Sequence, residues 1–159
     1  MMRERVLLCV DDERSVLQAL RRVLRREPYQ IVTATGGQEG LALLQTQRVQ
    51  VVVSDQRMPE MAGTEFLEQV KIHYPETVRV ILSGYAEVYA IIDAINKAEV
   101  YRFLPKPWQD EELKYILQEC FEQYDRNKLY RKLLSRFHDQ KMHIDHGPSP
   151  SSRRSRRSP

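Results

Sequence analysis

Short apolar runs alternate with longer amphipathic segments along most of the chain. The apolar runs, rich in β-branched residues, predict five strands, at residues 6–10, 29–34, 49–53, 78–82 and 100–104. Apolar residues at helical spacing predict a helix after each strand, marked at residues 16–24, 38–46, 66–74, 88–98 and 113–124. Pro28 is expected to end the first helix and Pro75 the third. Five β-α repeats predict an α/β fold in which helices cover both faces of a parallel sheet.

The composition changes after residue 124. Residues 125–146 are polar and basic but keep apolar residues such as Leu129, Leu133 and Phe137, so we expect the fifth helix to continue as an extension or linker. A long coiled-coil seam is poorly supported. Alternating steps of three and four residues, counted from Leu113, place the polar residues Asn127 and Arg131 at positions that a seam would fill with apolar side chains. Residues 147–159 contain only Gly, Pro, Ser and Arg, which predicts disorder. The expected organisation is therefore a domain at 1–124, a helical extension at 125–146 and a tail at 147–159.

Charge and cysteine content narrow the functional class. The net charge is +3, but four arginines lie in the last seven residues, and the other 21 basic residues face 22 acidic ones. Binding of nucleic acid through this arginine-rich tail is one alternative function, although the tail offers no aromatic side chain for stacking on bases. Cys9 and Cys120 lie in apolar contexts typical of buried free thiols. Without a bilayer-spanning apolar run or a signal peptide, we expect a cytoplasmic protein and no membrane partner.

Candidate chemistry lies at the carboxyl ends of the predicted strands. Asp55 ends the central, most apolar strand, Asp11 and Asp12 follow the first, Ser83 the fourth and Lys106 the fifth. In a parallel sheet these ends emerge on one edge, where ligands bind in open α/β folds. Three clustered carboxylates favour a divalent cation, and a donor set of oxygens suits Mg²⁺. A carboxylate held by a metal and facing an ammonium group is a plausible nucleophile for phosphorus.

Each of these residues also has a plain structural interpretation. Asp11 and Asp12 suit the capping of a helix, Asp55 a turn, Ser83 a loop and Lys106 a solvated surface. The joint placement of these five residues, at the ends of four different strands along one sheet edge, favours the phosphoryl chemistry. One enzyme reading remains, an aspartyl-nucleophile phosphohydrolase. Such enzymes typically carry a second acid two residues after the nucleophile, where this chain has an arginine.

Residues 4–124 resemble the receiver domains of two-component response regulators, a doubly wound, flavodoxin-like family. The resemblance is carried by order and spacing, in Asp11-Asp12, the segment Asp55-Gln-Arg-Met-Pro-Glu-Met-Ala-Gly63, Ser83-Gly84, Phe103 and Lys106-Pro107. It implies that Asp55 accepts a phosphoryl group from a sensor histidine kinase or a phosphotransfer protein. It also implies that Mg²⁺ binds Asp12, Asp55 and the backbone carbonyl of Arg57, with Asp11 acting mainly through water.

The same resemblance implies roles around the phosphoryl group. Lys106 would contact it, Ser83 would move to meet it, and the backbones of Gly84 and Arg57 would hold its oxygens. Phe103 occupies the position of the switch aromatic, and strand parity makes Tyr101 a second candidate. A cis peptide is implied between Lys106 and Pro107.

The change of conformation that the resemblance implies on phosphorylation also suggests which partners the chain has. Phosphorylation would remodel the surface of the fourth helix, the fifth strand and the fifth helix, and a homodimer could form through that surface or through the extended fifth helix. The resemblance also implies a separate effector or an output module outside this chain, rather than turnover catalysis. The short string Phe103 to Trp108 is weakly similar to receivers joined to cyclic-dinucleotide phosphodiesterase or kinase-like modules.

Overall fold

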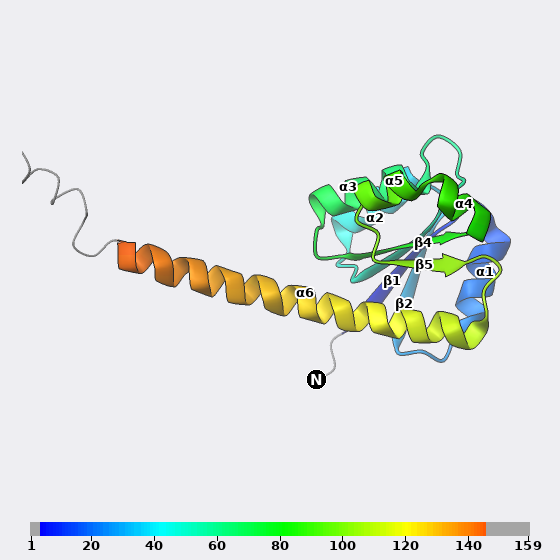
Figure 1. Ribbon diagram of the computed structural model, residues 1–159. Helices are drawn as coiled ribbons and strands as arrows, with labels where there is room; N and C mark the ends of the chain where they lie inside the picture. Colours follow the sequence, from blue (N-terminus) through cyan, green and yellow to red (C-terminus); the bar gives the residue numbers. More distant parts are fainter. Residues whose placement is uncertain (1–3, 146–159) are drawn as a thin grey trace, which may run out of the picture. The chain divides into compact units, whose positions relative to one another are not determined.

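The computed structural model describes residues 4–145. Its first part, up to Tyr124, is built around a five-stranded, fully parallel sheet (Figure 1). The strands are ordered β2-β1-β3-β4-β5. The elements are β1 Arg5–Val10, α1 Arg14–Val23, β2 Tyr29–Ala34, α2 Gly37–Thr46, β3 Val51–Asp55, α3 Gly63–His73, β4 Val78–Ser83, α4 Tyr85–Ala90, α5 Ile92–Lys97, β5 Arg102–Pro105 and α6 Asp110–Asp145. The predicted α/β class, with helices on both faces of the sheet, is confirmed.

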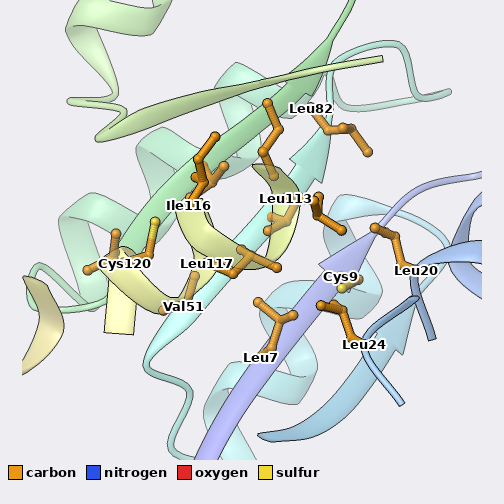
Figure 2. Close-up of a cluster of buried hydrophobic side chains, with 14 of the residues drawn as sticks. Leu7, Cys9, Leu20, Leu24, Val51, Leu82, Leu113, Ile116, Leu117 and Cys120 are labelled. Carbon is orange, nitrogen blue, oxygen red and sulfur yellow. The ribbon is translucent and has the colours of Figure 1, made fainter. Parts of the chain in front are cut away.

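Alternating side chains of the strands divide the core into two layers. On one face Leu7 and Val51 pack with α1 and with the part of α6 before residue 125, and Figure 2 shows leucines of both helices converging on these strands. On the other face Leu8 and Val52 pack with α2 and α3. Every residue of β3 is buried, as expected for the middle strand of a parallel sheet covered on both sides. The core therefore fixes the end of β3, where Asp55 lies.

The helical segment after β4 differs from the prediction of one helix. It forms two six-residue helices, α4 and α5, joined at Ile91. The Ile91 N–H donates to the carbonyl of Val88, three residues back, and the φ and ψ angles of Ile91, −120° and 22°, depart from helical values. All residues of both helices are exposed or half-buried. Periodic apolar positions that pack weakly do not impose a continuous helix on this segment.

Two element boundaries also differ from the sequence expectation. Helix α1 ends at Val23 rather than at Pro28, because the chain turns at Leu24, whose N–H donates to the carbonyl of Leu20. Strand β5 begins at Arg102 rather than at residue 100, because the N–H of Val100 donates to Ile95 and closes a turn after α5. Both differences arise from local hydrogen bonds that apolar patterning does not encode.

The chain divides into two compact units at Tyr124, and α6 runs through that boundary to Asp145. The extended C-terminal helix is therefore confirmed, and the apolar side chains of its second part are exposed as far as Phe137. The tail at 147–159, for which we expected disorder, lies outside the described residues. None of the helices within residues 4–145 combines the length and apolar character that crossing a bilayer requires.

Cys9 and Cys120 are buried free thiols. Burial raises the pKa of each thiol to about 12, so almost none of the reactive thiolate exists at neutral pH. We expect maleimide to label the native protein at least roughly two orders of magnitude more slowly than the protein unfolded in urea. Mass spectrometry over time checks this, and rapid labelling of the native chain would contradict the burial of both side chains.

Candidate functional site

Three carboxylates meet where β1 and β3 end. Carboxylate oxygens of Asp11, Asp12 and Asp55 lie within 4.8 Å of one another. Asp11 and Asp55 are buried, whereas Asp12 is exposed. The register of the parallel strands aligns β1 with β3, which brings the two loops to the same edge of the sheet. The structure thus places together the three acids that the sequence predicted to converge.

Lys106 enters this pocket from the end of β5. Its Nζ lies 3.1 Å from Asp55 Oδ1 and 3.2 Å from Asp11 Oδ2, and its side chain is 26% exposed. The backbone N–H of Lys106 donates to the carbonyl of Ser83 at 2.9 Å, which ties the loop after β5 to the end of β4. The structure therefore argues against the alternative interpretation of Lys106 as a solvated surface residue. The peptide between Lys106 and Pro107 is cis, as expected.

The crowding of charge perturbs the titration of the pocket. Burial raises the pKa of Asp55 above its ordinary value, the charge of Asp11 raises it further, and Lys106 only partly opposes this. Burial also raises the pKa of Asp11. Burial alone would lower the pKa of Lys106, but its hydrogen bond to Asp55 and the charges of both acids outweigh that effect and raise it. The folded chain therefore holds more negative charge here than one lysine neutralises.

A structural role for Asp11 exists alongside its place in the pocket. Its Oδ1 accepts a hydrogen bond of 2.9 Å from the backbone N–H of Glu13, which is the N-cap residue of α1. Neither Asp11 nor Asp12 occupies the N-cap position, so simple capping does not account for these two acids. The turn fixes Asp11 while its second oxygen faces Lys106.

Ser83 is the last residue of β4 and Gly84 follows it, beside this pocket. The Ser83 side chain is fully buried, and its hydroxyl donates to Oε1 of Glu87 on α4. A Cβ added to Gly84 would meet its nearest neighbour, the carbonyl oxygen of Lys106, only at 4.0 Å. Gly84 is therefore not required by packing, and its predicted role concerns its backbone alone.

Arg57 lies two residues after Asp55, and its side chain is 85% exposed. Its Nε donates to Oε2 of Glu87, so this glutamate joins Ser83 to Arg57. Sequence reasoning missed Glu87, because its contacts depend on how α4 packs against the loop after β3. An acid four residues after a candidate hydroxyl, one helical turn away, is the only signal that pointed to it.

The two candidate switch aromatics differ in their surroundings. Phe103 lies in β5, is half-buried against the core layer of α3, and contacts Tyr85 edge to face at 5.4 Å between ring centroids. Tyr101 precedes β5 and is 37% exposed. Phe103 is therefore the more packed of the two aromatics and is the one that contacts α4.

Gln56 and Gly63, to which the sequence analysis gave no individual role, hold the loop after β3 through hydrogen bonds. The side-chain oxygen of Gln56 accepts the backbone N–H of Thr64 at 2.9 Å, and its nitrogen donates to the Thr64 hydroxyl at 3.2 Å. Gly63, the first residue of α3, donates its N–H to the carbonyl of Gln56 at 2.9 Å. These bonds give partners to the backbone N–H groups of the first turn of α3, and they fix the loop that carries Arg57.

Gly63 is required by a close approach to the backbone of Asp55. A Cβ at Gly63 would lie 2.0 Å from the Asp55 carbonyl oxygen, whereas a Cβ at Gly36 would meet nothing within 4 Å. We expect Gly63→Ala to lower the free energy of unfolding by about 3 kcal/mol, because backbone must shift on both sides of the contact. The matched control Gly36→Ala should change it by at most about 0.5 kcal/mol. Urea unfolding measures both, and equal effects would contradict the close approach.

The pocket suits a small, hard divalent cation. The acids offer only oxygen ligands, and exposed Asp12 leaves one side open to water and substrate. Mg²⁺ prefers such ligands and retains several waters. The residues that would hold it are Asp11, Asp12 and Asp55, each of which offers a carboxylate oxygen. When bound, the ion would offset the negative charge of these carboxylates.

Comparison with known proteins agrees with this architecture. The sequence profile of the response regulator receiver domain matches residues 7–118. The hydrogenase transcriptional regulatory protein HoxA of Cupriavidus necator is 40% identical over 111 residues, covering 70% of this chain and 23% of HoxA. This chain thus spans about a quarter of the length of that relative.

Solved structures give the same result. The signal receiver domain of an HD domain-containing protein from Pseudomonas fluorescens Pf-5 is 34% identical with a TM-score of 0.76, covering 80% of this chain and 94% of that one. The chemotaxis response regulator CheY4 of Vibrio cholerae is 30% identical with a TM-score of 0.68, covering 74% and 99%. With its parallel sheet, its acidic pocket and these matches, the chain belongs to the family of response regulator receiver domains.

Proposed function

We propose that this receiver domain takes a phosphoryl group onto Asp55 from a sensor histidine kinase or a phosphotransfer protein, in a Mg²⁺-dependent reaction. The observation that carries the proposal is the buried Asp55 carboxylate, paired with Lys106 at 3.1 Å inside a pocket of three acids. This arrangement combines a nucleophile, a fixed cation and a set of ligands for a divalent metal.

In the proposed reaction a carboxylate oxygen of Asp55 attacks the phosphorus of phosphohistidine. The new O–P bond forms as the N–P bond breaks, and the imidazole nitrogen keeps the electron pair of that bond. Lys106 stays close to the transferred phosphoryl oxygens and offsets their charge. The open side of the pocket at Asp12 and Arg57 gives the donor access. The product is an aspartyl phosphate, which water later hydrolyses.

The proposed output is a change in the surface formed by α4, α5, β5 and the first part of α6. Large apolar side chains are exposed there, including Tyr85, Tyr89 and Ile92, and this favours a contact with a partner or a second copy of the chain. The extension of α6 exposes further apolar residues and offers a second dimer contact. We propose that the chain acts in the cytoplasm and controls an effector or output module.

Incubation with Mg²⁺ and acetyl phosphate, followed by intact mass spectrometry, tests the phosphoryl acceptor. We expect a single phosphoryl increment that requires Mg²⁺, does not form when EDTA is present from the start, and is removed by hydroxylamine, because an acyl phosphate is labile to this nucleophile. An increment that resists hydroxylamine, or that forms equally without a divalent cation, would contradict the proposal.

A further inference from the structure

One buried hydroxyl beside the pocket is already engaged by a side chain outside the acid cluster. Ser83 is fully buried and donates its hydroxyl proton to Oε1 of Glu87, one turn further along the chain. The other oxygen of Glu87 accepts from Arg57 Nε. The Glu87 side chain is 18% exposed, so both of its carboxylate oxygens are held in a partly dry site.

A hydroxyl group carries one proton and can satisfy one strong acceptor at a time. A phosphoryl group on Asp55 would bring three more acceptor oxygens to the edge of the sheet where Ser83 lies. Both competitors, the carboxylate and the phosphoryl group, are anionic and bond the hydroxyl strongly. For Ser83 to donate to the phosphoryl group, it must therefore release Glu87.

Glu87 also lines a groove that reaches one acid of the pocket. Asp12 and Arg57 line the same groove. Arg57 follows Asp55 by two residues, and its Nε donates to the second carboxylate oxygen of Glu87. The network thus connects the loop that carries the acceptor aspartate with α4, the helix that begins directly after Gly84.

We propose that Glu87 is a positioning residue that holds the Ser83 hydroxyl away from the acceptor and so opposes the phosphorylated conformation. The inference rests on the proposed phosphorylation of Asp55 and adds an internal competitor to it. Among the described residues Glu87 bonds the side chains of Ser83 and Arg57 and none of the three acids of the pocket, and its effect on the acceptor passes through the proton of Ser83. Release of this contact frees the start of α4 when the phosphoryl group arrives.

The test uses the full chain and beryllofluoride, which mimics a phosphoryl group on a carboxylate, at saturating Mg²⁺. Bound fluoride is followed by ¹⁹F NMR. We expect Glu87→Ala to bind the mimic about three- to tenfold more tightly than the unmodified chain, which is the size of one hydrogen bond exchanged. Ser83→Ala should bind it more weakly. In the Ser83→Ala background, Glu87→Ala should give no further change.

The double variant separates this mechanism from a general effect of charge. If removing Glu87 merely reduced repulsion of an anion, the gain would persist without the Ser83 hydroxyl, and this outcome overturns the inference. Glu87→Gln, which preserves shape for folding, should give a smaller gain in the same direction. Glu68→Ala, which removes a glutamate paired with Lys97 on the surface, should leave binding unchanged.

Failure of the two proposals can be told apart. If the unmodified chain binds no beryllofluoride with Mg²⁺, the phosphoryl acceptor and the inference both fail. If the unmodified chain binds it but Glu87→Ala binds no more tightly, phosphorylation stands and the role of Glu87 is overturned. A folded Glu87 variant is confirmed by circular dichroism before binding is compared.

Discussion

Asp55→Asn is expected to reduce phosphoryl incorporation to the detection limit, at least about a hundredfold below the unmodified chain. The amide is isosteric with the carboxylate but lacks a nucleophilic oxygen of comparable strength. Asp55 is the acid at the end of the central strand and the one that Lys106 approaches most closely. Intact mass spectrometry after incubation with Mg²⁺ and acetyl phosphate measures the effect.

Two controls define what this result means. Asp93→Asn alters an exposed aspartate on α5 and should leave incorporation unchanged. Asp12→Asn retains the acceptor but weakens the metal site, so phosphorylation should survive only at higher Mg²⁺ concentration. Incorporation at the normal level in Asp55→Asn would exclude Asp55 as the acceptor, whichever residue carried the group instead.

Lys106→Met should produce the second large effect, on both stability and metal dependence. The change keeps an unbranched side chain only one atom shorter but leaves Asp11 and Asp55 without the lysine ammonium. We expect the free energy of unfolding without divalent cations to fall by about 2–3 kcal/mol near neutral pH. Mg²⁺ should stabilise the variant more than the unmodified chain, because the ion supplies charge that the lysine no longer provides. Urea unfolding with EDTA or Mg²⁺ measures both quantities.

The pKa shifts of the two acids predict how the loss of stability in Lys106→Met changes with pH. The pKa values of Asp11 and Asp55 are already raised in the folded chain, mainly by burial, so the folded state binds protons more tightly than the unfolded state. Their destabilising contribution is therefore present above the folded pKa and is relieved as the pH falls through it. Loss of Lys106 removes the opposing charge, so the deficit of the variant should shrink as the solution becomes acidic.

The matched control is Lys71→Met, which breaks the surface pair between Lys71 and Glu99 at 2.7 Å. Such a pair contributes at most about 1 kcal/mol, and Mg²⁺ should not compensate for its loss. Equal destabilisation by the two methionine variants, or a Lys106 variant insensitive to Mg²⁺, would contradict the charge balance assigned to the pocket.

The order of strands and helices and the approach of the acids to one edge were determined by the sequence alone. Apolar runs fix which segments lie inside the sheet, and parallel topology sends all carboxyl ends to the same edge. Asp55 at the end of a fully buried strand and Lys106 after the last strand are thereby placed on the same edge of the sheet. This part of the site needs no knowledge of individual contacts.

Other features were decided only by the tertiary structure. The break at Ile91, the contact of Gly63 with the Asp55 backbone and the choice of Glu87 as partner of Ser83 all depend on how separate loops and helices pack. Arg79 is a further case, since it lies buried in β4 and donates to the carbonyls of Thr77 and Ala98. Periodicity records which face of an element is apolar. Hydrogen-bond partners and close backbone approaches depend on distances between elements far apart in the chain, which periodicity does not contain.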